Sequence, residues 1–192
     1  MTTPVPGPWD KRGLRAQLLA RRRALPPQAL AAAGPALLAA LEPVLPPEGP
    51  VAVYAALGAE PPTAPLLARL GPRALLPVLA DDGDLDWAAW DGQLVAGPRG
   101  TAAPAGPRLG RDAVSGCGLV VVPALAVDRR GTRLGRGGGS YDRALRRAQG
   151  VVVALLHDGE LVDALPREPH DAPVHAAATP SGGLVRFGIL PP

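Results

Sequence analysis

The chain has little cysteine and few aromatic residues, and each shortage excludes a class of protein. Cys117 is the single cysteine among 192 residues, so neither an internal disulfide nor a thiolate metal cluster can form, as is usual in a reducing compartment. Aromatic residues make up only 3% of the sequence, whereas proteins that bind single-stranded nucleic acid use aromatic side chains to stack the bases. The net charge of +3 comes from dispersed arginines rather than a basic tail. The sequence therefore favours small anionic ligands over nucleic acid.

Long apolar runs are also missing. Residues 1–9 contain threonines and prolines but no apolar signal-peptide segment, and no later run approaches the ~20 residues that a membrane span requires. There is no internal repeat and no coiled-coil heptad pattern. Because 192 residues with 47% hydrophobic content suffice for one buried core, we expect a single domain over residues 1–192, with residues 1–9 flexible. We expect this domain to be cytoplasmic and monomeric, without nucleic-acid or membrane partners.

The order of the apolar segments predicts an α/β fold. Residues 119–122 form a continuous run of strand-forming residues, which is typical of a central parallel strand covered on both faces. Strands and helices alternate around it, which predicts a single-domain, three-layer α/β/α architecture with a mostly parallel, Rossmann-like sheet and ligands at the carboxyl ends of its strands. The predicted strands are 51–55, 74–79, 85–90, 119–122 and 151–156. The predicted helices are 10–25, 28–45 with an interruption near Gly34 and Pro35, 65–70 and 141–148.

A glycine- and arginine-rich segment follows the predicted central strand. Residues 120–143 have the sequence V-V-V-P-A-L-A-V-D-R-R-G-T-R-L-G-R-G-G-G-S-Y-D-R. Consecutive glycines let backbone N–H groups approach an anion, Arg133 and Arg136 supply charged donors, and Asp142 is available for a divalent cation. The P-loop pattern G-x-x-x-x-G-K-S/T is absent, and G-x-G-x-x-G fails at Ser140. The segment predicts a less common type of phosphate site, and a flexible glycine linker is the alternative.

The first predicted helix carries a basic stripe. At about 100° per residue, Lys11, Arg15 and Arg22 fall on one line beside a second line of leucines. Such a helix can dock through its leucines and present cations along one edge. A solvated basic face remains the alternative.

Taken together, these segments resemble the 5-formyltetrahydrofolate cyclo-ligase family, also called 5,10-methenyltetrahydrofolate synthetases. Residues 123–143 are similar to the family's P-G-L-A-F-D-x-x-G-x-R-L-G-x-G-x-G-Y-Y-D-R. Three more segments follow the family in order. They are K-x-x-L-R…R at 11–22, Tyr54 with E-P-P-T at 60–63, which resembles the family's Y…E-V-x-T, and P-x-E-x-H-D-x-P-V…T at 166–179. The sequence departs from the family at Ser140, which replaces a tyrosine, at Val127, which replaces a phenylalanine, and at residues 99–104, which lack the phenylalanine and glutamate of F-G-I-x-E-P.

The resemblance implies an enzyme that uses ATP and Mg²⁺ to cyclise 5-formyltetrahydrofolate to 5,10-methenyltetrahydrofolate, releasing ADP and phosphate after phosphorylation of the formyl oxygen. It implies that Arg136 is catalytic, lying between the γ-phosphate and the formyl oxygen. The ATP-binding residues that it implies are Lys11, Arg15, Arg133, Leu134, Gly135, Arg136, Gly137, Gly138, Gly139, Ser140 and Tyr141.

The resemblance also implies a folate site and a metal site. The implied folate-binding residues are Tyr54, Ala55, Glu60, Arg136 and Ser140, with Glu60 accepting hydrogen bonds from the pterin. The implied Mg²⁺ ligands are Asp142 and Asp171. Each acidic residue also has a purely structural alternative: a turn glutamate at 60, a helix first-turn aspartate at 142 and an Asx turn at 171. Two other functions stay open, namely an ATP-using relative with a different substrate and a non-catalytic nucleotide- or RNA-binding module.

Overall fold

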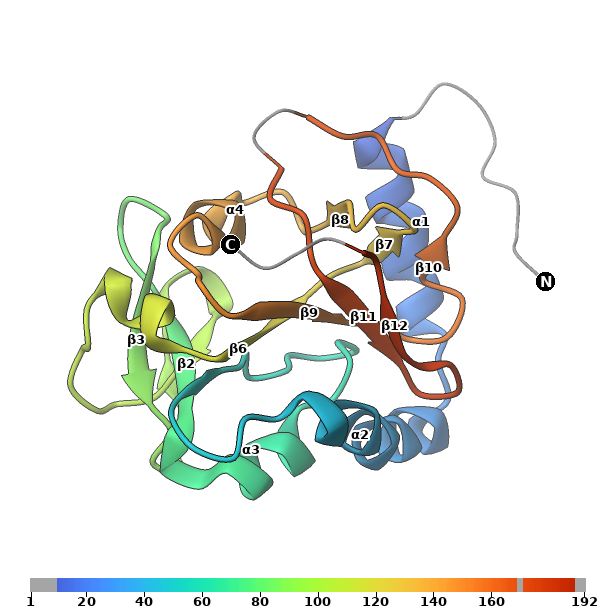
Figure 1. Cartoon of the computed structure of the whole chain (residues 1–192). Coiled ribbons are helices and arrows are strands. Elements are labelled where there is room, and N and C mark those ends of the chain that lie inside the picture. The colour runs from blue at the N-terminus through green and yellow to red at the C-terminus, as the bar shows by residue number, and fades with distance from the viewer. Residues whose placement is uncertain (1–9, 169–170, 189–192) are drawn as a thin grey trace.

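A central seven-stranded sheet organises the computed structural model, which describes residues 10–168 and 171–188 (Figure 1). Its five inner strands run parallel and its two outer strands pair antiparallel. The expectation for residues 1–9 lies outside the described part of the chain. The strand order is β12 (Gly183–Arg186), β11 (Ala176–Thr179), β9 (Val151–Leu155), β6 (Leu119–Pro123), β1 (Val51–Ala52), β2 (Ala74–Leu79) and β3 (Leu85–Ala89).

Helices cover both faces of this sheet, which confirms the predicted three-layer architecture (Figure 1). One face is covered by α2 (Pro27–Leu41) and α3 (Ala64–Leu70), and the other by α4 (Ser140–Leu145). The helix α1 (Lys11–Arg23) packs instead on a small sheet formed by β10 (Leu161–Val162), β7 (Ala126–Asp128) and β8 (Arg133–Leu134). The remaining elements are the hairpin β4 (Val95–Ala96) and β5 (Ala102–Ala103), and the 3-10 turns η1 (Glu42–Val44), η2 (Gly71–Arg73), η3 (Pro98–Gly100) and η4 (Arg111–Gly116).

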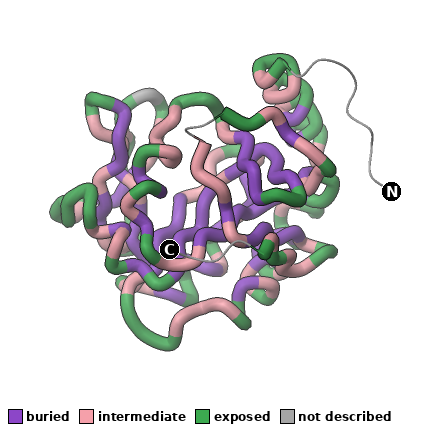
Figure 2. Tube along the Cα trace, turned by 45° about the horizontal axis from the view of Figure 1, so that its top comes forward, coloured by how far each residue is buried: buried purple, intermediate pink, exposed green. Residues whose placement is uncertain are grey.

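Strand β6 is buried on both sides, as its sequence predicted. Leu119 and Val121 pack towards α2 and α3, whereas Val120 and Val122 pack towards α4. Buried segments follow the central strands, and exposed segments are concentrated in the loops and outer turns (Figure 2). A parallel sheet of this kind places its loops for ligand binding at the carboxyl ends of the strands.

One expectation about an individual element is wrong, and several short strands were missed. The helix α2 continues through Pro35, where an interruption was predicted, because packing of its buried face on the sheet outweighs the local cost of a proline. Gly34 permits this packing, since a Cβ there would lie 3.0 Å from Pro65 Cγ. The strands β7, β8, β10, β11 and β12 were not predicted; each has only two to four residues, and their stability depends on neighbouring strands rather than on local sequence.

Within the described residues, no single helix is long and apolar enough to cross a membrane. Helices α1 and α2 with η1 reach the necessary length and apolar content only as a pair, and the chain bends by 103° between them.

Gly150 precedes β9 and lies against the chain that enters β6. A Cβ at this position would lie 2.2 Å from the Cys117 carbonyl oxygen and 2.5 Å from that of Gly118. Because backbone must move to relieve this overlap, we expect Gly150→Ala to lower the free energy of unfolding by about 3 kcal/mol. Urea denaturation would measure the loss, with Gly116→Ala as control because a Cβ at Gly116 meets no atom within 4 Å. Equal midpoints for the two variants would contradict the prediction.

Candidate active site

A cavity of about 410 Å³ lies at the carboxyl ends of β1, β2 and β6. Segments far apart in the sequence line it, from α1 near one end of the chain to Asp171 near the other. Every site residue predicted from the sequence is on its wall: Lys11, Arg15, Tyr54, Ala55, Glu60, Arg133, Leu134, Gly135, Arg136, Gly137, Gly138, Gly139, Ser140, Tyr141, Asp142 and Asp171. The fold therefore brings the residues predicted to bind ATP and those predicted to bind folate around one cavity.

The glycine segment, residues 135–139, forms one wall of the cavity. After β8, the chain adopts φ values of 102° at Gly137 and 68° at Gly139, which L-residues with side chains rarely take. The Nε of Arg15 donates a hydrogen bond of 2.9 Å to the Gly135 carbonyl. The basic edge of α1 thus holds the glycine segment in place, and both contribute to the same cavity wall.

The two predicted metal ligands are ion-paired with predicted phosphate-binding cations. Lys11 Nζ lies 3.0 Å from Asp171 Oδ2 and 2.8 Å from a Glu168 carboxylate oxygen, and Arg133 Nη2 lies 2.8 Å from Asp142 Oδ1. Partial burial disfavours the charged form of Lys11, but its hydrogen bonds to Glu168 and Asp171 outweigh this and raise its pKa. Acidic and basic side chains therefore lie side by side at the cavity wall.

Arg133 also has one buried donor without a partner among the described residues. Its side chain is 4% exposed, and its Nε has no hydrogen-bond partner among the described residues. A buried unpaired donor is costly, and because this Nε has almost no accessible surface, a ligand in the cavity would reach it only after the side chain moved.

The carboxylates fit a cation that is already bound to phosphate. No group of three or more His, Cys, Asp or Glu side chains within the described residues can hold a metal ion. Mg²⁺ typically takes one or two carboxylates and fills its shell with water and substrate phosphate oxygens. Asp142 and Asp171 suit that requirement, since both line the cavity beside the cations expected to bind phosphate.

Glu60 and Arg136 connect the loop after β1 with the glycine segment. Arg136 Nε lies 3.3 Å from Glu60 Oε1, while Glu60 Oε2 accepts a hydrogen bond of 3.0 Å from the Leu57 N–H. Glu60 thus does stabilise its own turn, as the structural alternative proposed, yet its other oxygen is directed towards the cavity residue Arg136. The Arg136 side chain is 58% exposed and that of Glu60 only 10%, so the carboxylate is the fixed partner of this pair.

Two tyrosines lie beside Glu60 as neutral groups. Burial raises the pKa of both Tyr54 and Tyr141, and the nearby Glu60 charge adds to the shift. The Tyr54 hydroxyl donates a hydrogen bond of 2.7 Å to the Pro61 carbonyl. The Arg133 guanidinium lies 5.7 Å from the centre of the Tyr141 ring. Both rings therefore shape the cavity and its polar lining rather than exchange protons.

Arg22 was grouped with the cationic stripe of α1 but was not predicted as a site residue. Its side chain is 3% exposed, makes two 2.7 Å hydrogen bonds to the Glu160 carboxylate and also donates to the Ala124 carbonyl. Leu18 is the other buried residue of the helix, one turn earlier, which is the pattern that marks Arg22 as facing inward. Other cavity residues carried no chemical signal in the sequence: Leu57, Pro77, Leu79, Leu85, Thr101, Ala102, Pro123, Ala124 and Leu125.

A sequence model of the 5-formyltetrahydrofolate cyclo-ligase family matches residues 9–180. The chain belongs to this family. A 5-formyltetrahydrofolate cyclo-ligase of Mycolicibacterium smegmatis is 38% identical over 189 residues, covering 93% of this chain and 97% of that protein. An Escherichia coli protein of the same name is 44% identical over 66 residues, covering 33% of this chain and 36% of its own length. The resemblance inferred from the sequence motifs is confirmed.

Solved structures agree with the cyclo-ligase assignment. The 5,10-methenyltetrahydrofolate synthetase of Aquifex aeolicus superposes with a TM-score of 0.78 at 26% identity, covering 94% of both chains. The synthetase of Mycoplasma pneumoniae superposes with a TM-score of 0.70 at 19% identity, covering 88% of this chain and 98% of that one, and so supports the fold alone. This cyclo-ligase is an enzyme that acts on a folate, and its cavity is the candidate active site.

Proposed function

We propose that this cyclo-ligase converts 5-formyltetrahydrofolate and ATP into 5,10-methenyltetrahydrofolate, ADP and phosphate in the cavity described above. The observation that carries the proposal is the Arg136–Glu60 contact of 3.3 Å, which joins the glycine segment to the loop after β1. The glycine segment, with Lys11, Arg15 and Arg133 around it, suits a triphosphate. The rest of the lining includes Glu60 and the apolar residues Pro77, Leu79 and Leu85, which suit a flat pterin ring with polar edges.

The reaction must remove an amide-type oxygen, and phosphorylation makes that oxygen a leaving group. In the first step the formyl oxygen attacks the γ-phosphorus, the bond from the γ-phosphorus to the bridging oxygen breaks, and ADP is released. In the second step N10 attacks the activated carbon, the N10 proton is lost, and phosphate leaves with the former formyl oxygen as the ring closes. This sequence requires orientation of two substrates and neutralisation of phosphate charge, but no covalent enzyme intermediate.

Arg136 is our candidate for the group that acts on the transferring phosphoryl group. Its guanidinium lies between the glycine segment and Glu60, where negative charge would move from ATP to the formyl oxygen. Its exposure leaves N–H donors available to a substrate. Glu60 Oε1 is our candidate acceptor for the amide and amino donors of the pterin.

Asp142 and Asp171 would hold Mg²⁺ together with phosphate oxygens and water. The ion would neutralise charge on the ATP phosphates. Lys11 and Arg133 would then be released from the two aspartates to contact phosphate directly.

We also propose that the enzyme acts as a cytoplasmic monomer on these small molecules, without nucleic-acid or membrane partners. The chain has a single, free cysteine and no disulfide, which is usual in a reducing compartment.

The deciding experiment follows the near-ultraviolet absorbance of the methenyl product when purified protein meets 5-formyltetrahydrofolate. We expect product only when ATP and Mg²⁺ are both present, and no product when either is omitted. Product formation without ATP would overturn the proposed chemistry. ATP binding with no folate product would favour a relative with another substrate. Because Ser140 replaces a tyrosine of the family, a panel of folates tested for ATP turnover would examine that alternative.

A further inference from the structure

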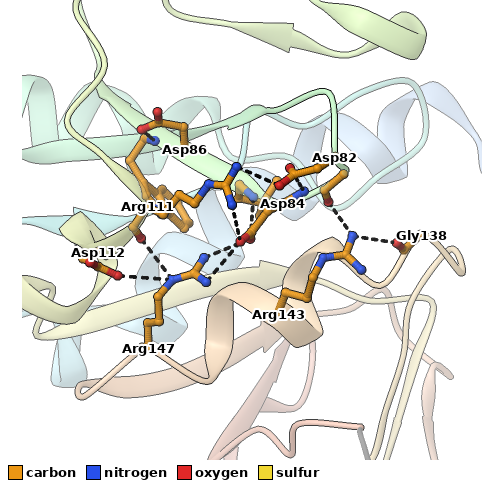
Figure 3. Close-up of polar contacts among 11 residues, drawn as sticks. Asp82, Asp84, Asp86, Arg111, Asp112, Gly138, Arg143 and Arg147 are labelled. Atoms are coloured by element: carbon orange, nitrogen blue, oxygen red, sulfur yellow. Dashed lines mark hydrogen bonds and ion pairs between the residues drawn. The ribbon is translucent and has the colours of Figure 1, made fainter.

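Two arginines of the α4 region reach away from the cavity to the turn that joins β2 and β3 (Figure 3). Arg143 Nη2 donates to the Gly83 carbonyl at 2.6 Å and to the Gly138 carbonyl at 3.3 Å. One guanidinium therefore bridges the β2–β3 turn and the glycine segment. Arg143 is exposed, and it is not among the residues that line the cavity.

Arg147, four residues later, fixes the same turn. Its Nη1 and Nη2 donate to the two carboxylate oxygens of Asp84 at 3.1 and 2.9 Å. The Asp84 side chain is only 9% exposed, and its hydrogen bonds to Arg147 lower its pKa, so the carboxylate stays charged near neutral pH. Arg111 adds a bond of 2.8 Å to Asp82. The β2–β3 turn is thus a firmly held support rather than a loose loop (Figure 3).

The support connects two walls of the cavity. On one side of the turn Leu79 ends β2, on the other Leu85 begins β3, and both line the cavity. On the far side of Arg143 lie Gly138 and Gly139, which line the cavity from the glycine segment. A Cβ at Gly139 would lie 3.2 Å from Arg143 Nη1, so the guanidinium packs directly against this segment.

The hydrogen bond from Arg143 to the Gly138 carbonyl also determines the direction of the next backbone donor, the Gly139 N–H. The described chain contains no cis peptide bonds, and in a trans peptide the carbonyl and the next N–H point in opposite directions. With the Gly138 carbonyl turned towards Arg143, the Gly139 N–H is turned the other way. Backbone N–H groups of this segment are the donors proposed for the ATP phosphates, and small changes in their direction weaken binding considerably.

We propose that Arg143 is a positioning residue for ATP: by bridging Gly83 and Gly138, it orients the glycine segment for the phosphates without touching the substrate. The inference rests on the proposed function, because it takes ATP as the ligand of this segment. This positioning role differs from a general stabilising role, because loss of Arg143 should weaken the binding of ATP and not that of the folate.

The test compares Arg143→Gln with the wild type in steady-state kinetics on both substrates. We expect the KM for ATP to rise about tenfold and the KM for 5-formyltetrahydrofolate to stay within about twofold, because a charged bridge to two carbonyls is lost. Arg143→Lys should restore part of the ATP KM, since an ammonium can still reach a carbonyl. Arg146→Gln is the matched control, because it removes the same charge from an exposed neighbour.

Each outcome bears on one of the two proposals. If Arg143→Gln matches Arg146→Gln, or raises both KM values equally, the positioning role is overturned. If the lysine variant is no better than the glutamine variant, the hydrogen-bond bridge is not the cause. If the wild type makes product without ATP, the proposed function fails instead. Thermal melting of each variant shows whether it is folded. If Arg143→Gln does not fold, the ATP KM of Arg143→Lys relative to the wild type tests the positioning role instead.

Discussion

Arg136→Ala is expected to lower kcat by about 10²–10³-fold while raising the KM for ATP by less than about threefold. The guanidinium lies beside Glu60, between the two proposed substrates, where it would meet charge that develops during transfer. ATP would still be held by Lys11, Arg15 and Arg133, so its binding depends little on this residue. Steady-state kinetics with each substrate varied in turn would measure both values.

Two comparisons sharpen this prediction. Arg136→Lys keeps the charge but loses the planar fork, and we expect it to recover only part of kcat. Arg12→Ala removes an exposed arginine from α1 and should leave kcat unchanged. Because Arg136 is exposed, the alanine variant should unfold at the same urea concentration as the wild type. Parallel losses in kcat and in ATP affinity would instead make Arg136 a docking residue.

Glu160→Gln is expected to lower the free energy of unfolding by about 4 kcal/mol, the largest effect on stability that we predict. The change would leave the Arg22 guanidinium charged and buried without its carboxylate partner. The two Glu160 oxygens accept from Arg22, and Oε2 also accepts from the His157 N–H at 2.8 Å, so the single amide oxygen of glutamine cannot replace both. Urea denaturation followed by circular dichroism would measure the change.

A surface pair provides the matched control. Glu42 and Arg69 form an ion pair of 3.3 Å, but their side chains are 46% and 52% exposed, so Glu42→Gln should cost less than about 1 kcal/mol. Replacing both buried partners, with Arg22→Met and Glu160→Leu, should recover much of the loss because no unpaired charge remains. The prediction would be wrong if Glu160→Gln cost no more than Glu42→Gln.

The elements that the sequence alone predicts best are those whose burial is indicated by a continuous run of apolar residues. Strand β2 has the predicted bounds of 74–79, and β6 is central and covered on both faces. Both are runs of apolar residues long enough to stand out from their surroundings. The candidate site residues lie in short motifs that resemble one family, and the fold gathers all of them around one cavity, while their roles stay predictions.

What sequence could not give are features that depend on distant partners. The alanine-rich strand β11 has weak strand preference, and it pairs with β9 because neighbouring strands and helices enclose it. The role of Arg22 depends on Glu160, which is separated from it by 138 residues. The spacing of Arg22 one turn after Leu18 hints that it faces inward, but nothing in the local pattern identifies its distant carboxylate partner.

Lys11 and Asp171, which form an ion pair across the cavity wall, are 160 residues apart. During synthesis α1 therefore leaves the ribosome long before the residues that it contacts. Its docking closes a very large loop, and contacts of such high sequence separation form slowly. The central strands can pair earlier, whereas the cavity is complete only after almost the whole chain has been made. Unfinished chains should consequently remain inert towards ATP and folate until synthesis has passed residue 171.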